Sequence, residues 1–258
     1  MAWRSSGSSN AALVNNLAAN GLIKSERVKN AMLKVCHSPS SPPYPLPPPH
    51  SHHGRSGADD RGRRGGPQVD RAHYAPSAPY EDSPQAIGFG ATISAPHMHA
   101  AACESLLAFL HPSARVLDVG SGSGYLTHVL ANLVAPEGTV VGVDHIQGLV
   151  DLAAANMAKG VEGKELLLDA KRVRFVKADG RLGWREGGPY DAIHVGAAAR
   201  DVHPQLIEQL KAPGRMFIPV EEMLVQNIWV IDKKADGRVE RERLYGVRYV
   251  PLTDAPKG

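Results

Sequence analysis

The sequence predicts an α/β protein built on a doubly wound, mostly parallel sheet. The stretch 115–144, RVLDVGSGSGYLTHVLANLVAPEGTVVGVD, has the order strand, glycine-rich turn, helix, strand. Three further apolar runs, at 172–177, 190–196 and 214–220, alternate with segments of helical spacing. A chain of 258 residues, 43% of them hydrophobic, is long enough for one such domain with a full core and some appendages.

The glycine-rich turn is the centre of this prediction. Residues 116–119 form an apolar run suited to a buried parallel strand, and the glycines of GSGSG then allow a tight turn into a helix. Side chains at these glycines would block a ligand. Residues 139–143 form the next predicted strand, so Asp144 is expected at its carboxyl end. Open α/β sheets bind their ligands there, and an acid in that position can hold two ribose hydroxyls.

The residues around the turn favour a cationic ligand. Tyr125 stands where a dinucleotide-binding fingerprint needs a small residue, and Asp118, just before the turn, would repel a pyrophosphate. S-adenosylmethionine carries an ammonium and a sulfonium group and no phosphate. Asp118, the glycine turn and Asp144 together therefore favour this cofactor over NAD. The alternative that Asp118 only caps the turn remains open.

The other elements follow from hydrophobic spacing, caps and breakers. Gly21 is a natural stop for the first helix, and Ser25 can cap the second. The predicted helices span 10–20, 25–35, 97–110, 146–159 and 205–211. A final hairpin is predicted around Asp236-Gly237, with strands at 227–232 and 245–251.

The stretch 36–69 differs in composition from the rest of the chain. It holds eight of the twenty prolines and almost no aliphatic residues, so it cannot bury a core. We expect a disordered insertion between N-terminal helices at 1–35, packed on the core, and a domain at 70–258. Its length is tolerable because closing a loop costs only ~0.6 kcal/mol per doubling of length. Docking of the proline tract to a partner's aromatic groove is an alternative, and its histidines lie in a ligand-poor tract, so no metal site is expected.

Charge, hydropathy and cysteine content exclude several classes of function. Most of the net charge of +3 comes from 36–69, which leaves the remainder nearly neutral and argues against a nucleic-acid partner, because phosphate neutralisation needs a basic face. No run approaches the ~18 apolar residues of a membrane span, and the first residues lack the pattern of a signal peptide. We therefore expect a cytoplasmic protein, by default a monomer. Cys36 and Cys103 have no partners at metal-binding spacing and are expected to be reduced thiols.

Seven motifs along the chain carry a resemblance to a known family. They are GFGATISAPHMHA, LDVGSGSGYLT, VGVDHI, ADGR, YDAIHVGAAA, GRMFIPV and GVRYVPLTD. Together they resemble the protein-L-isoaspartate O-methyltransferase family. The resemblance covers essentially the whole chain except 36–69, and the start, with MAW and NGLIKSERV, is similar to the eukaryotic members. Joining Val35 to Asp70 gives AMLKVDRAHY, which looks like an uninterrupted family segment.

The resemblance implies a fold and an activity. The fold is the seven-stranded, mostly parallel sheet of S-adenosylmethionine-dependent methyltransferases, with N-terminal helices and a C-terminal antiparallel hairpin. The activity is methyl transfer from S-adenosylmethionine to the carboxylate of L-isoaspartyl and D-aspartyl residues, as a step in the repair of damaged proteins. The partners would then be isoaspartyl-containing peptides and proteins.

Site residues come from the residue chemistry and from the resemblance together. The pair Ala95-Pro96 biases the residues before it away from a helix, so Thr92 and Ser94 are expected in an extended loop. Ser94 matches the family's active-site serine and would orient the acceptor carboxylate, although it could instead only cap the following helix. Asp179 could accept a hydrogen bond from the adenine amino group, or form a simple Asp-Gly turn. The full set of predicted cofactor positions is Ala91, Thr92, Ile93, Ser94, His99, Asp118, Gly120, Ser121, Gly122, Asp144, His145, Asp179, Gly180 and Thr253.

One part of the chain departs from the family pattern. The family commonly has a glycine-rich loop after the fifth strand, whereas here Val220 is followed by Glu221-Glu222-Met223-Leu224. If that loop helps to position the C-terminal strands, activity would be weakened. Three alternatives remain. One is a methyltransferase for another acceptor, such as a small molecule or RNA, which the cofactor motifs alone do not exclude. The altered loop and the insertion motivate the second, an adaptor that binds cofactor or damaged chains without turnover, and the third is a nicotinamide enzyme.

Overall fold

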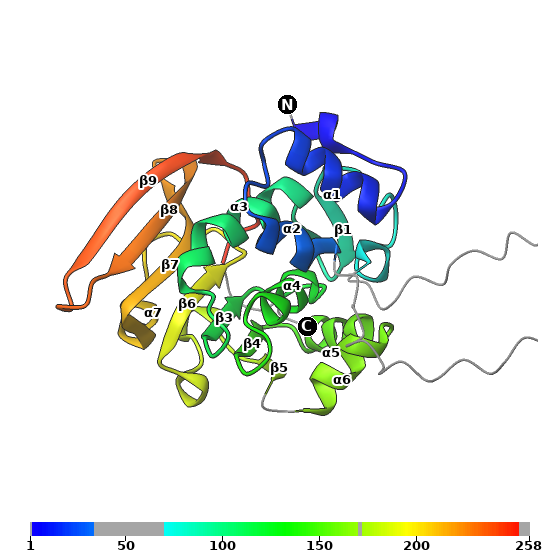
Figure 1. The fold of residues 1–258 in the computed structure, drawn as a ribbon. Helices are drawn as coiled ribbons and strands as arrows, with labels where there is room; N and C mark the ends of the chain where they lie inside the picture. The colour runs from blue at the N-terminus through cyan, green and yellow to red at the C-terminus, as the bar shows by residue number, and fades with distance from the viewer. Residues whose placement is uncertain (1, 34–69, 170–171, 253–258) are drawn as a thin grey trace, which may run out of the picture.

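The computed structural model describes residues 2–33, 70–169 and 172–252 (Figure 1). The predicted insertion at 36–69 and the predicted site residue Thr253 lie outside these ranges. The main sheet has seven strands in the order β5-β4-β3-β6-β7-β8-β9. The first five in this order are parallel, and β8 and β9 are antiparallel to their neighbours. The predicted fold class is confirmed.

The elements have the following bounds. The strands are β1 Gln85–Gly88, β2 Ala91–Ile93, β3 Arg115–Val119, β4 Thr139–Asp144, β5 Val173–Lys177, β6 Tyr190–Val195, β7 Leu210–Glu222, β8 Val225–Lys233 and β9 Val239–Val247. The α-helices are α1 Asn10–Ala19, α2 Glu26–Leu33, α3 Pro96–Leu106, α4 Tyr125–Leu133, α5 Gln147–Met157, α6 Val161–Leu168 and α7 Pro204–Gln209. Short 3-10 helices span Ala2–Ser5, Arg71–His73, Leu107–Phe109, Gly180–Leu182 and Arg185–Gly187.

Alternate residues of the central strands pack on opposite faces of the sheet. In β3, Val116 belongs to the core beneath α3, α4 and α5, whereas Leu117 and Val119 belong to a second core beneath α7. All three are fully buried, as expected for a parallel strand covered on both faces. None of the helices in the described part of the chain is long and apolar enough to cross a membrane.

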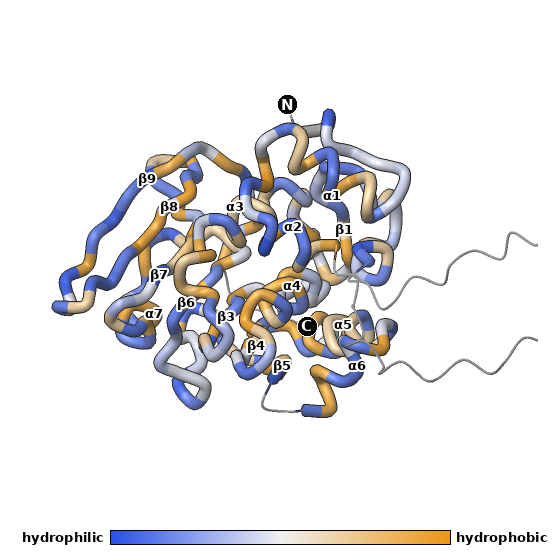
Figure 2. Tube along the Cα trace, viewed as in Figure 1, coloured by the Kyte–Doolittle hydropathy of each residue, from blue (hydrophilic) through white to orange (hydrophobic). Residues whose placement is uncertain are grey.

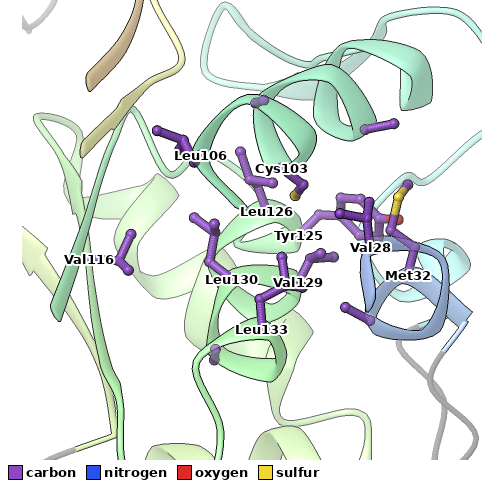
Figure 3. Packing of buried hydrophobic residues seen from close by; sticks show 14 of the residues in the cluster. Val28, Met32, Cys103, Leu106, Val116, Tyr125, Leu126, Val129, Leu130 and Leu133 are labelled. Atoms are coloured by element: carbon purple, nitrogen blue, oxygen red, sulfur yellow. The ribbon is translucent and has the colours of Figure 1, made fainter. Parts of the chain in front are cut away.

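The N-terminal helices pack onto the larger of these two cores. Leu130 and Val129 of α4 lie between Val116 of the sheet on one side and Val28 of α2 on the other (Figure 3). All four of these side chains are completely buried. Burial of one such side chain stabilises the fold by about 1.5–3 kcal/mol, so α2 is held by apolar packing against α4.

The C-terminal strands differ from the predicted bounds. β7 begins at Leu210 rather than at 214, and its register against β6 shifts between Leu210 and Arg215, which lets Pro213 bulge from the ladder. The final strand was predicted at 245–251, whereas β9 spans Val239–Val247. Nearly all of β9 is exposed on both faces, and most of its length is coloured hydrophilic in the Cα tube of Figure 2, so it lacks the alternation that marks a half-buried strand.

Gly124, just before α4, and Gly237, between β8 and β9, have the same backbone conformation but different surroundings. Gly124 and Gly237 both have φ of +84°, but a Cβ on Gly124 would lie 3.0 Å from the Cβ and carbonyl oxygen of Ala153. A Cβ on Gly237 would meet nothing within 4 Å. We expect Gly237→Ala to lower the free energy of unfolding by about 1–2 kcal/mol through backbone strain alone. We expect Gly124→Ala to cost about 2–4 kcal/mol, because crowding adds to that strain. Urea denaturation measures both, and equal losses would contradict the predicted crowding.

Candidate active site

A cavity of about 290 Å³ lies at the carboxyl ends of β3, β4 and β6. β3 has β4 on one side and β6 on the other. This is therefore the switch point where α/β sheets bind ligands, and we call it the switch-point cavity. Among the predicted cofactor positions, its lining contains Ala91, Thr92, Gly120, Gly122, Asp144, His145 and Gly180.

The glycine turn forms the floor of the switch-point cavity. The amides of Gly120 and Ser121 donate to the carbonyl oxygen of Val143, at 2.8 and 3.1 Å, which fastens the turn to the end of β4. Gly120 has φ of +75° and lies against Gly196, where an added Cβ would approach the Gly120 oxygen to 3.1 Å. The two backbones approach closely because neither residue has a side chain.

Asp144 presents a fixed carboxylate to this cavity. One of its oxygens accepts from the amide of Gly122 at 3.1 Å, and the other accepts from the amide of Ile146 at 3.2 Å. His145 Nδ1 lies 3.4 Å from the second oxygen. Each oxygen keeps lone pairs for a ligand, since a carboxylate can accept about four hydrogen bonds. The described lining residues include no lysine or arginine, so the cavity offers a phosphate no permanently charged cation.

Asp118 lies beneath the turn and not in the cavity. It is 1% exposed, and its oxygens accept from Thr127 Oγ1 at 2.5 Å and pair with His194 Nδ1 at 2.7 Å. Asp118 is thus outside the described lining of the switch-point cavity, and its predicted contact with the methionine end of the cofactor stays a prediction. A local sequence pattern could not reveal this, because the His194 partner comes from β6. The carboxylate links β3, β6 and α4 under the floor of the cavity.

The end of the described chain forms one wall. Ala198, just after β6, donates its amide to the carbonyl oxygen of Val250 at 2.8 Å and accepts from the amide of Leu252 at 2.7 Å. Val250, Pro251 and Leu252 consequently line the switch-point cavity. Phe89, in the turn between β1 and β2, lines it from another direction and packs over Gly148, where a Cβ would lie 2.4 Å from the aromatic ring.

A second cavity of about 230 Å³ adjoins the first and contains Ser94. Thr92 lines both cavities, so they meet at this residue. The Ser94 cavity is also lined by Arg248 and Tyr249. Burial raises the pKa of Tyr249 to about 12, against the opposing effect of a hydrogen bond with Ser94. The phenol is therefore neutral near pH 7 and can donate a hydrogen bond together with the serine hydroxyl.

A buried arginine supports the backbone of Ser94. Arg71 is fully buried, its Nη2 donates to the Ser94 carbonyl oxygen at 2.7 Å, and its guanidinium lies 5.0 Å from the ring centre of Tyr125. Burial lowers the pKa of Arg71 to about 10, which still leaves it cationic near neutral pH. Its Nη1 lies 3.3 Å from His99 Nδ1, and burial holds the pKa of His99 well below its usual value. His99 lies outside both described cavity linings, and its contact with the cofactor stays a prediction.

The remaining predicted residues are distributed around these cavities. Ile93 is part of the apolar core, and Ser121 is buried outside both linings. The carboxylate of Asp179 pairs with Arg181 at 2.7 Å, and only its neighbour Gly180 lines the switch-point cavity. Contact of Asp179 with adenine stays a prediction. Within the described ranges, no group of three or more His, Cys, Asp or Glu residues could hold a metal ion.

Sequence reasoning missed Phe89, Arg71 and the wall at 250–252. Phe89 lies between Gly88 and Gly90, and all three residues have positive φ, so the GFG triplet was an available signal of a special turn. Arg71 and the wall act through contacts with segments distant in sequence. No local pattern marks such contacts.

Comparison with known proteins identifies the family. The sequence profile described as Protein-L-isoaspartate(D-aspartate) O-methyltransferase (PCMT) matches residues 58–257. The chain belongs to this family. A Caenorhabditis elegans protein-L-isoaspartate O-methyltransferase is 42% identical over 253 residues, which is 98% of this chain and 96% of the relative. A Triticum aestivum protein of the same name is 50% identical over 187 residues, or 72% of this chain and 80% of the relative.

A solved structure supports the same assignment. It is that of a Plasmodium falciparum protein assigned the protein-L-isoaspartate O-methyltransferase activity, in complex with S-adenosyl-L-homocysteine. The two chains superimpose with a TM-score of 0.76 and 30% sequence identity, covering 96% of this chain and 99% of that chain. The isoaspartate methyltransferase fold therefore extends across the main sheet and the N-terminal helices.

In this member of the isoaspartate methyltransferase family, Thr127 donates a hydrogen bond to the carboxylate of Asp118 under the glycine turn. The contribution of this hydrogen bond to stability can be measured. We expect Thr127→Val to lower the free energy of unfolding by about 1.5–3 kcal/mol, because the change removes a hydrogen bond to the buried charge of Asp118. Thr127→Ser keeps the hydroxyl and is the matched control, expected to lose less. Chemical denaturation of the three proteins measures the difference. A loss no larger for valine than for serine would mean that the hydroxyl contributes little.

Proposed function

We propose that this protein transfers the methyl group of S-adenosylmethionine to the free carboxylate of an L-isoaspartyl or D-aspartyl residue in a damaged protein. The observation that carries the proposal is the meeting of the two cavities at Thr92, with Asp144 facing the first and Ser94 the second. A donor bound in one cavity and an acceptor bound in the other would have their reacting groups side by side. Membership of the isoaspartate methyltransferase family supports S-adenosylmethionine as the donor and an isoaspartyl or D-aspartyl residue as the acceptor.

The residues of the switch-point cavity fit the donor. The glycine floor leaves room for a ligand close to the backbone, and Asp144 can accept from the two ribose hydroxyls. A lining without lysine or arginine suits a ligand that carries positive charge and no phosphate. When bound, S-adenosylmethionine supplies an electrophilic methyl group on a sulfonium centre. The proposed contacts are made by Ala91, Thr92, Gly120, Gly122, Asp144, His145 and Gly180.

The residues of the Ser94 cavity fit the acceptor. A carboxylate is already ionised near neutral pH and is itself the nucleophile, so no general base is required. The Ser94 hydroxyl and the Tyr249 phenol would donate hydrogen bonds to it, and Arg248 would supply a positive charge at the same cavity. Their task is alignment, which supplies ~7–11 kcal/mol in favourable cases. Because Arg71 holds the Ser94 carbonyl oxygen, the serine is fixed before the acceptor arrives.

We further propose that the protein acts as a monomer in the cytosol and on polypeptides rather than nucleic acids. The buried free thiol of Cys103 suits a reducing compartment. The small net charge outside 36–69 does not provide the basic face that phosphate backbones require. Sedimentation velocity measures the oligomeric state directly.

The proposed reaction is tested by transfer of labelled methyl groups to an isoaspartyl peptide and to its normal aspartyl twin. We expect transfer to the isoaspartyl peptide only. Transfer to neither peptide, with measurable binding of S-adenosylhomocysteine, would favour an adaptor that binds without turnover. Equal transfer to both would show that the enzyme does not read the altered backbone.

Substitution of Ser94 separates acceptor alignment from donor binding. We expect Ser94→Ala to reduce kcat by at least about tenfold, since a hydrogen bond to a charged group contributes about 1.5–3 kcal/mol, and to leave the Kd for S-adenosylhomocysteine nearly unchanged. The exposed Ser113→Ala is the control. Steady-state kinetics and calorimetry give the two quantities, and equal losses in both would contradict the role of Ser94.

Substitution of Asp144 tests the donor side. We expect Asp144→Asn to weaken binding of S-adenosylhomocysteine by about 10- to 100-fold, because the amide loses the charge and one acceptor oxygen offered to the ribose. Asp151→Asn, an exposed change on α5, is the control. Titration calorimetry measures the affinity. Unchanged affinity in a folded Asp144 variant would rule out the ribose contact.

A further inference from the structure

The turn between β7 and β8 carries an unusual pair of residues. Met223 and Leu224 form a two-residue loop, because Glu222 pairs directly with Val225 across the hairpin. Both have left-handed backbone conformations, with φ of 47° and 67°. Met223 is 96% exposed and Leu224 is 93% exposed. We call Met223, Leu224 and the half-exposed Val225 the hairpin tip.

This choice of residues is unfavourable for a turn on two counts. A two-residue hairpin turn with positive φ at both positions strongly prefers Asn-Gly, and a large side chain there strains the backbone. Two large apolar side chains also remain in water. The next hairpin of this chain uses the favourable chemistry, since Gly237 occupies its left-handed position. Strained, exposed apolar residues indicate a surface with a function.

The hairpin tip stands at the same edge of the sheet as the two cavities. β7 runs parallel to β3 and β6, so its carboxyl end lies at the edge where the switch-point cavity opens. Glu221, two residues before Met223, donates its amide to the carbonyl oxygen of Ala199 at 2.8 Å. Ala199 follows directly after Ala198, which holds the cavity wall. The base of the hairpin is thus fastened to the rim of the switch-point cavity.

The hairpin is also fastened to the Ser94 cavity. Gln226, just after the tip, accepts a hydrogen bond from the Tyr249 amide and donates its Nε2 to the Tyr249 carbonyl oxygen at 3.2 Å. Tyr249 lines the Ser94 cavity. The hairpin tip therefore lies close to the Ser94 cavity, within reach of residues that flank an altered residue bound there.

We propose that the hairpin tip is a docking surface for apolar side chains of the acceptor polypeptide, on residues that flank the isoaspartyl position. The inference rests on the proposed function and adds a preference among its substrates. The occupant is an extended, locally unfolded segment, because local unfolding exposes apolar side chains that a folded protein buries and makes the isoaspartyl group accessible. Methionine suits this task, since its flexible side chain adapts to different partners.

The test uses a variant that relaxes the turn while it removes the apolar surface. Met223→Asn together with Leu224→Gly gives the preferred turn sequence, so the hairpin should form at least as well as before. The probes are two synthetic isoaspartyl peptides of equal length, with leucine and valine flanking the isoaspartyl residue in one and serine and glutamine in the other. The matched control is Val161→Ser with Leu168→Ser, which removes two exposed apolar residues from α6, next to the opposite edge strand β5.

We expect wild type to show a KM about tenfold lower for the apolar-flanked peptide than for the polar-flanked one. The tip variant should lose this difference by raising the KM of the apolar-flanked peptide alone, with kcat and melting temperature retained, and the α6 control should keep it. Equal KM values for both peptides in wild type, or an unchanged difference in the tip variant, would overturn the proposal. The proposal would also be overturned if wild type formed a dimer in sedimentation and the tip variant did not, since the tip would then bind a second copy of the chain. Failure of wild type to methylate either peptide would instead refute the proposed function.

Discussion

The contact between Asp118, Thr127 and His194 is the constraint on which the site depends. A buried carboxylate is unfavourable unless it is hydrogen-bonded, and here one oxygen binds the helix after the glycine turn and the other binds the neighbouring strand. The ends of β3 and β6 and the start of α4 are thereby held together. The turn between them has to pass through left-handed conformations that glycine adopts easily. The floor of the switch-point cavity follows from these two requirements.

The rest of the site is assembled from segments distant in sequence. The segment before α3 carries Thr92 and Ser94, and it is supported from below by Arg71, which lies close to the N-terminal helices. The wall at 250–252 comes from the end of the described chain and is held by backbone bonds to Ala198. Packing of α2 on α4 completes the arrangement, because it joins the N-terminal helices to the helix that follows the glycine turn (Figure 3). The two cavities therefore depend on the whole fold rather than on one motif.

Much of this arrangement could be predicted from local sequence, and the failures share a physical cause. The glycine turn and the place of Asp144 at the end of a strand could be predicted, since strand, turn and terminal acid are contiguous in the chain. The burial of Asp118 beneath the turn could not be predicted, because its partner His194 lies in another strand. β9 was misplaced because a strand with both faces in water carries no hydrophobic period. The support that Arg71 gives to Ser94 could not be predicted, since nothing near Arg71 in sequence indicates burial.

The final strand of the sheet has a further consequence. β9 ends the main sheet, and within the described residues no strand pairs with its outer side. Such an edge is a template on which a foreign strand can add, and the acceptors proposed for this protein are damaged chains prone to that kind of pairing. The run Glu240 to Arg243 alternates acidic and basic side chains along the edge, which opposes addition of uncharged, aggregation-prone strands. The charges on β9 thus protect the enzyme's own edge from pairing with an unfolded chain.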